Sequence, residues 1–337
     1  MKVAVGLSGG VDSAVAAKLL LEQGHEVAGY TMALGRPGEE RALAEARAVA
    51  ASLGIRLAVC GFEDLWRREV ADYLRETYRS GRTPNPCVRC NERVKFSALP
   101  RTAFADGFDM FATGHYARTG VGEDGRVWLR RAADRTKDQS YFLYRVDPDV
   151  LARTLFPLGG MTKTEVRAFA RGAGIAVAQK GDSQDFCGGD VHALAGCGGR
   201  PGEICDVSGR VLARHDGIGR FTVGQRKGLG IGGGGTPWYV VAIDAAADRV
   251  VVDREEGAVR RSLEVKDARW LVPEPTDGAP RSVRVKIRSS GEPRGPATLH
   301  GTVCEFPQGL FGVAPGQSAV FYSEDGEEVL GGGIIKG

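Results

Sequence analysis

The turn at residues 8–13, Ser-Gly-Gly-Val-Asp-Ser, constrains the fold of this chain more than any other feature. The apolar residues just before it, Val3, Val5 and Leu7, predict a buried strand, and apolar residues at helical spacing follow it. Glycines let backbone N–H groups approach a ligand closely, and the start of a helix supplies unsatisfied donors and a positive dipole. The order of strand, glycine turn and helix therefore predicts an anion site, most simply one for phosphate.

The polar residues of this turn suit a phosphate that is accompanied by a cation. Ser8 and Ser13 can donate hydroxyl hydrogens to phosphate oxygens, whereas the Asp12 carboxylate needs a cation such as Mg²⁺ between itself and the phosphate. The turn is not a Walker A loop, because no Gly-Lys-Ser or Gly-Lys-Thr follows, and its glycines lack the spacing of the dinucleotide fingerprint. The alternative is an ordinary strand-to-helix turn built from small residues.

The pattern after the turn predicts a doubly wound α/β domain with a parallel sheet. Strands are predicted at residues 26–32, 55–59 and 108–113, and a helix is predicted between the first two, at residues 39–53. Further helices are expected at residues 62–78, from residue 136 and from Thr162, which forms a capping box with Glu165.

Ligands of such sheets bind at the carboxyl ends of the strands, where Met32, Gly114 and His115 are expected. Met32 can pack on an adenine ring or simply fill the core. Gly114 allows a ligand to approach the strand end closely. His115 can contact a phosphate, polarise an acceptor or have a structural role only.

The sequence changes character around two cysteines, Cys87 and Cys90, which follow two prolines at Cys-x-x-Cys spacing. The pair can form half of a zinc site, a redox pair or part of an iron–sulfur site, or be incidental. A zinc site with four cysteine ligands is disfavoured, because the sequence has no second Cys-x-x-Cys. The basic neighbours Arg89 and Lys95 favour the thiolate form of Cys90. A lone cysteine, Cys187, follows a polar run and is expected to be accessible.

From about residue 196 onward, glycine-rich turns and short alternating segments replace the strand–helix alternation. Their regular spacing predicts a small β-barrel or sandwich. Its strands are expected at residues 282–288, 297–305, 318–322 and 328–330, and two earlier strands are expected around an Asp-rich turn at 238–243 and 249–252. Strict alternation places Arg284, Lys286 and Arg288 on one face, which either follows a phosphate backbone or is simply solvent-exposed.

Composition limits the remaining classes of protein. The net charge is only +3 over 337 residues, so a nucleic-acid surface has to come from local clustering. Seven cysteines in a chain of this length do not predict a secreted disulfide scaffold. No signal-peptide pattern and no apolar run of membrane-spanning length is present. We therefore expect a soluble, cytoplasmic protein without a membrane partner.

The motifs taken together resemble the tRNA-specific 2-thiouridylase family, which belongs to the PP-loop ATP pyrophosphatases. The turn at residues 8–13 resembles the PP-loop, and the other motifs occur in the family's order at residues 83–96, 114–118, 137–143, 182–187, 222–231, 315–322 and 330–335. The resemblance covers nearly the whole chain. It implies a PP-loop catalytic domain at residues 1–195, a central β-rich domain at 196–262 and a C-terminal β-barrel at 263–337, the last two contacting tRNA.

The resemblance implies an ATP-dependent sulfurtransferase that converts the wobble uridine of tRNA to 2-thiouridine. ATP, assisted by Mg²⁺, adenylates the C2 oxygen with release of pyrophosphate, and sulfur then displaces AMP. The expected ATP contacts are Gly6, Leu7, Ser8, Gly9, Gly10, Val11, Asp12, Ser13, Met32 and Gly114.

By position, Cys187 matches the family cysteine that carries the incoming persulfide, and Cys90 matches the second catalytic cysteine. The sulfur would come from a donor such as a cysteine desulfurase or a relay protein. The resemblance gives Asp12, Cys87, Cys90, His115 and Cys187 as the catalytic set. It implies contacts to tRNA or its target base at Asn85, Pro86, Cys87, Lys137, Asp138, Gln139, Arg288, Ser289 and Gln317.

One departure from the family opens a second route for sulfur. Many members have an aspartate where this chain has Cys87, so three thiolates, Cys87, Cys90 and Cys187, are available to hold a [4Fe–4S] cluster. A cluster-bound hydrosulfide would then be the alternative to the persulfide. Cys197 and Cys205 either relay sulfur or are incidental. The competing functional classes are a PP-loop enzyme that adenylates a small molecule and a non-catalytic RNA-binding module.

Overall fold

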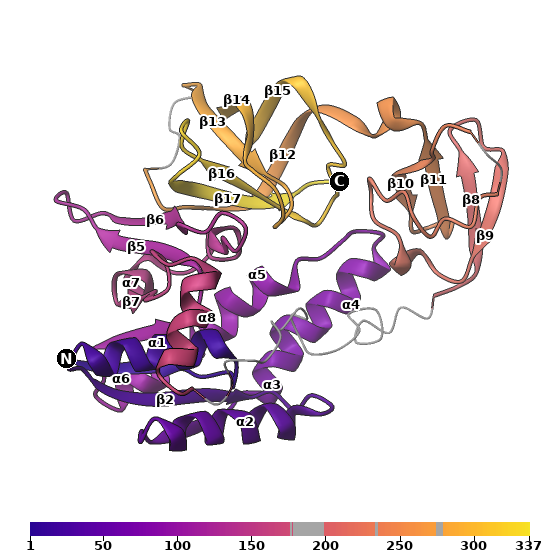
Figure 1. The fold of residues 1–337 in the computed structure, drawn as a ribbon. Coiled ribbons are helices and arrows are strands. Elements are labelled where there is room, and N and C mark those ends of the chain that lie inside the picture. The colour runs from indigo at the N-terminus through magenta and orange to yellow at the C-terminus, as the bar shows by residue number, and fades with distance from the viewer. Residues whose placement is uncertain (176, 178–198, 233–234, 274–278) are drawn as a thin grey trace. The chain divides into compact units, whose positions relative to one another are not determined.

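The computed structural model describes residues 1–175, 177, 199–232, 235–273 and 279–337, and these form two compact units (Figure 1). The first unit contains the N-terminal sheet, the helices packed on it and the short segment Glu327–Leu330. The second contains the β-rich part of the chain together with Val70–Pro86.

The N-terminal sheet is parallel in all its strand pairs, with the order β3-β2-β1-β4-β7. Its strands are β1 (Lys2–Gly6), β2 (Glu26–Ala33), β3 (Leu57–Gly61), β4 (Met110–Thr113) and β7 (Thr154–Leu155). Val3, Ala4 and Val5 are fully buried, as expected for a central strand that is covered on both faces. The predicted doubly wound α/β fold is confirmed, and the strand order reverses between β1 and β4.

Eight α-helices are described, two of them continued by π-helical turns at Arg67–Ala71 and Asn91–Lys95. They are α1 (Val11–Glu22), α2 (Glu39–Ser52), α3 (Glu63–Trp66), α4 (Asp72–Arg79), α5 (Pro86–Cys90), α6 (Ala98–Ala105), α7 (Pro148–Ala152) and α8 (Lys163–Gly172). The helix predicted at residues 62–78 is therefore α3, a π-helical turn and α4. Within the described ranges, no helix combines the length and apolar character that crossing a membrane requires.

The two predicted helix starts after residue 130 have different outcomes. The capping box is confirmed: Thr162 accepts a hydrogen bond from the Glu165 backbone, and the Glu165 carboxylate accepts one from the Thr162 backbone. The helix expected from residue 136 is wrong, since only a short 3₁₀ turn forms at Ser140–Phe142. The Asp138 carboxylate accepts hydrogen bonds from the backbone of Ala132 and Ser140, and such local bonds compete with a helix.

The β-rich part of the chain contains a four-stranded sheet and a closed six-stranded barrel, and a separate hairpin of β5 and β6 belongs to the first unit. The sheet has the order β10-β11-β8-β9, with β8 (Gly202–Asp206), β9 (Val211–His215), β10 (Tyr239–Asp244) and β11 (Arg249–Asp253). The barrel strands are β12 (Val259–Trp270), β13 (Arg281–Lys286), β14 (Arg294–His300), β15 (Val303–Phe311), β16 (Ser318–Tyr322) and β17 (Val329–Ile335), and the hairpin strands are β5 (Ala117–Val121) and β6 (Val127–Arg131). The predicted C-terminal barrel is confirmed.

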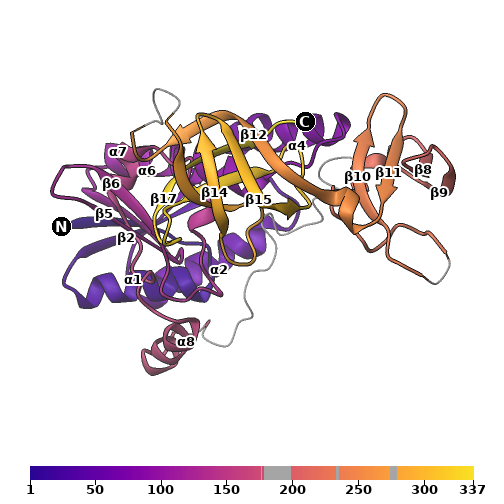
Figure 2. The same cartoon turned by 90° about the horizontal axis from the view of Figure 1, so that it is seen from above.

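Two details of the barrel differ from the sequence prediction. The single strand expected at residues 297–305 is a hairpin of β14 and β15, which lie side by side in Figure 2. Gly301, at φ +55°, adopts the left-handed backbone conformation that the turn between them requires. The predicted basic face is only partly formed, since Lys286 and Arg288 line one pocket and Arg284 does not. The pairing of β13 with β14 shifts register between Val283 and Val285, and Lys286 is buried rather than exposed beside Arg284.

The carboxyl end of β4 lies unusually close to the first turn of α1. A Cβ atom built on Gly114 would be 2.6 Å from the backbone carbon of Asp12 and 2.7 Å from the backbone nitrogen of Ser13. Only glycine therefore allows the strand end and the helix start to meet.

We predict that Gly114→Ala lowers the free energy of unfolding by about 1–3 kcal/mol, because the added methyl group meets backbone that cannot rotate away. Urea denaturation measures the change. Gly160→Ala is the matched control, since nothing lies within 4 Å of its added Cβ. Equal effects of the two substitutions would contradict the proposed close approach.

Candidate functional site

The predicted phosphate turn is a preorganised loop at the carboxyl end of β1. Its first backbone N–H group, at Ser8, donates to the Ser13 hydroxyl over 3.2 Å, and that hydroxyl donates to the Gly10 carbonyl over 3.0 Å. No side chain caps α1, whose N-cap is Gly10. Gly9, at φ +74°, lies against α2, where a Cβ atom would be 2.7 Å from Cβ of Glu45. The loop thus presents the start of α1 at the point where the strand order reverses, the usual ligand position in such sheets.

The predicted nucleotide contacts differ in what they can offer to a ligand. Leu7, Val11 and Ser13 have buried side chains, so their contacts to a phosphate have to come from the backbone. Gly6 is in register with Thr113, so β1 and β4 end side by side, whereas β2 continues three residues past Tyr30, the partner of Gly6, to Ala33. Met32 lies near the end of β2 and is partly exposed; its packing on an adenine ring stays a prediction.

Asp12 has two partners that the sequence analysis missed. Lys163 donates from Nζ to both carboxylate oxygens of Asp12, over 2.7 and 2.8 Å, and the Tyr116 hydroxyl donates to Oδ1 over 2.9 Å. Lys163 is fixed at the first position of α8 by the Thr162 cap and by its backbone N–H, which donates to Asp134. The capping box was recognisable from the sequence, but nothing local indicated that the next residue reaches the phosphate turn.

His115 follows Gly114 at the end of β4 and is held as a neutral imidazole. Its Nδ1 lies 2.8 Å from the Thr113 hydroxyl, and its ring packs beside Phe96 and Phe156. Burial lowers the pKa of His115 well below its ordinary value, and the charge of Lys95 lowers the pKa further. At neutral pH this side chain therefore acts as a hydrogen-bonding group and not as a cation.

The cysteine pair lies on the short helix α5. Cys87 is partly exposed, whereas Cys90, one helical turn later, is 5% exposed. Burial raises the pKa of the Cys90 thiol, and the charges of Lys95 and Arg36 only partly oppose this effect. The sequence prediction that basic neighbours favour a Cys90 thiolate is therefore wrong for this conformation.

Arg89 does not stabilise a thiolate at Cys90, because its charge is already paired. It forms an ion pair with Glu69 over 2.9 Å and approaches Glu92, which is also paired with Arg145. Acidic partners thus neutralise much of the positive charge that the sequence of this segment indicates.

Three further cysteines, Cys187, Cys197 and Cys205, were predicted to take part in sulfur transfer or to be incidental. Cys187 and Cys197 lie outside the described residues, so the three-thiolate set of Cys87, Cys90 and Cys187 stays a prediction. Among the residues that the structure describes, no group of three or more His, Cys, Asp or Glu side chains is arranged to hold a metal ion. Cys205 is buried in β8.

The loop with the predicted tRNA contacts Lys137, Asp138 and Gln139 is anchored internally. Asp138 is buried and pairs with Arg131 over 3.4 Å. The Gln139 side chain accepts a hydrogen bond from the Tyr116 backbone over 2.9 Å, and the Gln139 backbone donates back to the Tyr116 carbonyl. These contacts position Tyr116 for Asp12; direct contact of the loop with RNA stays a prediction.

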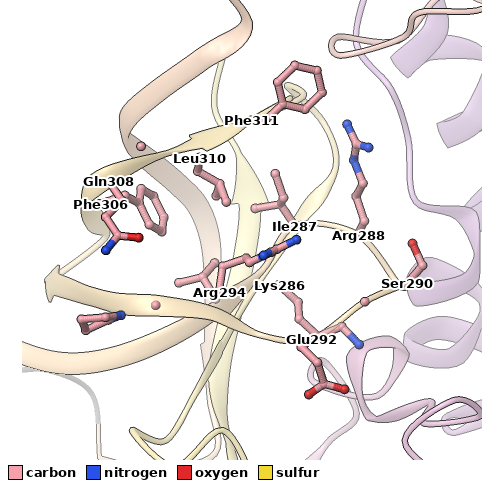
Figure 3. A pocket seen from close by; sticks show the side chains of 15 residues that line it. Lys286, Ile287, Arg288, Ser290, Glu292, Arg294, Phe306, Gln308, Leu310 and Phe311 are labelled. Atoms are coloured by element: carbon pink, nitrogen blue, oxygen red, sulfur yellow. The ribbon is translucent and has the colours of Figure 1, made fainter. Parts of the chain in front are cut away.

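A pocket of about 570 Å³ opens in the C-terminal barrel, between β13, β14 and β15 (Figure 3). It is lined by apolar groups, including Phe306 and Phe311, and by the cations Lys286, Arg288 and Arg294. The guanidinium group of Arg288 packs against Gly224 and Gly312, where added Cβ atoms would be 2.7 and 2.3 Å from Nη2. Both Arg288 and its neighbour Ser289 are exposed.

The segment of predicted base contacts, Asn85 and Pro86, follows a buried stretch at Thr83 and Pro84. Gln317 of the barrel donates a hydrogen bond from its side chain to the Pro84 carbonyl over 2.8 Å. Gln317 therefore contacts the protein's own chain next to the predicted base-binding residues.

Models of known protein families match nearly the whole chain. Three family models match in succession: a tRNA methyl transferase HUP domain at residues 1–188, a tRNA methyl transferase PRC-barrel domain at 196–254 and an aminomethyltransferase beta-barrel domain at 260–335.

Full-length relatives are described as tRNA-specific 2-thiouridylase MnmA. The protein from Pelobacter propionicus is 44% identical over 348 residues, covering 99% of this chain and 97% of the relative. The protein from Zymomonas mobilis is 43% identical over 352 residues, covering 99% and 93%. Among solved structures, a 4-thiouridine synthetase–RNA complex with bound ATP is 21% identical, covers 58% of this chain and 45% of its own, and has a TM-score of 0.37, a similarity too low to support an argument.

We predict that iodoacetamide modifies Cys87 faster than Cys90 at about pH 7.5, because alkylation requires an accessible thiolate. The rate at Cys90 should rise at a higher pH than for an ordinary thiol, since its pKa is raised. Lys95→Met removes a charge that lowers this pKa and should slow Cys90 further. Peptide mass spectrometry over a pH series measures each rate, with the buried Cys304 as an internal control. Faster labelling of Cys90 than of Cys87 at neutral pH would contradict the described burial.

Proposed function

This chain belongs to the tRNA-specific 2-thiouridylase family, and we propose that its residues replace the C2 oxygen of a tRNA wobble uridine with sulfur in an ATP-dependent reaction. The observation that carries the proposal is the presence of a preorganised phosphate turn and a cysteine helix in one chain that matches thiouridylases over 99% of its length. The products are 2-thiouridine, AMP and pyrophosphate.

The first step is adenylation of the uridine C2 oxygen, which then leaves as part of AMP. Backbone N–H groups at the start of α1, with Ser8 and the glycines beside it, bind the phosphates. Lys163 stabilises the charge that develops on the departing pyrophosphate. The Asp12 carboxylate is 32% exposed and suits Mg²⁺, which when bound neutralises phosphate charge. Neutral His115, at the end of β4, can hydrogen-bond to the uridine ring.

The second step supplies sulfur to C2. The terminal sulfur of a persulfide on Cys187 attacks C2, and AMP leaves. Cys90 then attacks the inner persulfide sulfur, so that the S–S bond breaks, thiouridine is released and a Cys90–Cys187 disulfide forms. A thiol reductant returns both cysteines to the reduced state. Because the pKa of Cys90 is raised in this conformation, α5 has to become more exposed or more cationic before Cys90 acts.

The alternative source of sulfur is an iron–sulfur cluster. Cys87 and Cys90, one turn apart on α5, have the ligand chemistry for two of its positions, and Cys187 would be the third. Such a cluster, when bound, supplies an iron-bound sulfur in place of the persulfide.

We infer a division of labour along the chain: ATP chemistry at residues 1–195, and tRNA binding at 196–262 and 263–337. The barrel pocket supports this inference, because Arg288 and Arg294 can bind phosphate while the partly exposed Phe311 can contact an unstacked base. A cysteine desulfurase or relay protein is the proposed sulfur donor, and the proposed site of action is the cytoplasm.

Thiolation of unmodified tRNA with ATP and a persulfide donor tests the sulfur route. We expect Cys90→Ala and Cys187→Ala to lower the rate by about 100-fold or more, because each removes a sulfur that forms or breaks a bond. Cys60→Ala, at a buried cysteine of β3, is the control.

The response of Cys87 separates the two routes. If Cys87→Ala stays active in an iron-free enzyme, the persulfide carries the sulfur. If all three variants fail and anaerobically bound iron falls with them, the cluster supplies it. Wild-type enzyme that forms no 2-thiouridine with ATP and either sulfide or a persulfide donor would contradict the proposed function.

We predict that Lys163→Met slows tRNA-stimulated ATP–pyrophosphate exchange about 10- to 100-fold, because it removes a cation next to the phosphates. Lys18→Met, which removes only a partly exposed pairing with Glu22 on α1, should have little effect. An unchanged exchange rate in Lys163→Met would show that its contact with Asp12 is only structural.

A further inference from the structure

The segment that connects α4 to α5, just before the cysteines, is held by one side chain of the barrel. Gln317 Nε2 donates to the Pro84 carbonyl over 2.8 Å and lies 3.4 Å from the Thr83 carbonyl oxygen. Both residues and the following Asn85 are buried. The amide group therefore binds two consecutive backbone acceptors directly before the segment of predicted base contacts.

Neighbouring contacts fix the same segment from two more directions. The Thr83 backbone N–H donates to the Pro315 carbonyl over 2.8 Å, and the Thr83 hydroxyl donates to the Thr222 hydroxyl over 3.1 Å. Gly316, at φ +90°, passes so close that an added Cβ would lie 2.8 Å from the Thr83 carbonyl oxygen. The segment is thus enclosed by the barrel loop before β16 and by the loop at Thr222.

Gln317 is itself held rigidly by the barrel. Its backbone N–H donates to the Ala314 carbonyl over 3.2 Å, and its carbonyl accepts from Ile335 of β17 over 2.8 Å. Gly316 donates to the Ile335 carbonyl over 3.0 Å. Because the backbone on both sides of the amide is fixed, its donor is preorganised for Pro84.

The contact is transmitted to the cysteines through a short and stiff piece of chain. Helix α5 begins at Pro86, two residues after Pro84, and both prolines fix their φ angles. The residue before each proline is also restricted. A shift of the Pro84 carbonyl therefore moves Asn85 and the first turn of α5, which includes Cys87.

We propose that Gln317 is a positioning residue for the reaction: it sets the start of α5 and so the placement of Asn85 and Cys87 toward the uridine. This proposal rests on the proposed function for its catalytic readout, and the expected contact of Gln317 with tRNA stays a prediction. The required group is an amide donor, so a carboxylate of the same shape cannot substitute for it.

Gln317→Glu and Gln317→Met test the proposal, since both keep the size of the side chain and remove the donor. We expect the thiolation kcat to fall about tenfold or more while the dissociation constant for tRNA stays within about twofold, because a misplaced reacting group affects the chemical step. Gln23→Glu, an exposed position at the end of α1, is the control for the same change of charge. Weaker tRNA binding with an unchanged kcat would overturn the proposal.

A second measurement needs neither tRNA nor turnover. The rate of Cys87 alkylation in the free enzyme should change by about threefold or more in both Gln317 variants, since the start of α5 is released. Thr222→Val, which removes the hydroxyl anchor of Thr83, should change it in the same direction and covers the case in which a Gln317 variant does not fold. Unchanged alkylation in every folded variant would also overturn the proposal. A wild-type enzyme without thiolation activity would instead contradict the proposed function alone.

Discussion

The close approach of β4 to α1 at Gly114 is the contact on which the predicted nucleotide site depends. A side chain there would push the strand end away from the backbone of Asp12 and Ser13. With glycine, the chain leaving β4 passes along the helix start, and the Tyr116 hydroxyl reaches Asp12 over 2.9 Å. The strand order reverses between β1 and β4, and ligands of such sheets are expected to bind at this point. Side chains from distant parts of the sequence meet at the same place.

The balance of charge at this place follows from that packing. Asp12 alone would repel phosphate, yet its carboxylate is paired with Lys163, which is only 11% exposed in its side chain. The capping box of α8 and the Asp134 carboxylate hold the lysine backbone, so the cation arrives in a fixed position. In the proposed function, a triphosphate that binds here would meet Lys163 as well as the loop donors, and a cation at Asp12 would replace the contact that Lys163 gives up.

Much of this architecture could be predicted from the sequence, because periodicity and turn chemistry are local. The parallel strands, the phosphate turn and the capping box at Thr162 were all recognisable in this way. Contacts between distant segments were not: Lys163 and Asp12 are 151 residues apart, and Gln317 and Pro84 are 233 apart. The sequence also showed no sign of the turn at Gly301 or of the register shift near Arg284, because apolar residues continue to alternate through both.

The cysteine helix shows why charge along a sequence differs from charge in space. Arg89 and Lys95 flank Cys90 in the sequence, but Arg89 is paired with Glu69, and the thiol is 5% exposed. Desolvation then outweighs the remaining cations and raises the pKa of Cys90. A thiol in this state is protected from solution oxidants and alkylating agents. The role proposed for Cys90 in sulfur transfer therefore requires that α5 move during the reaction and expose this sulfur.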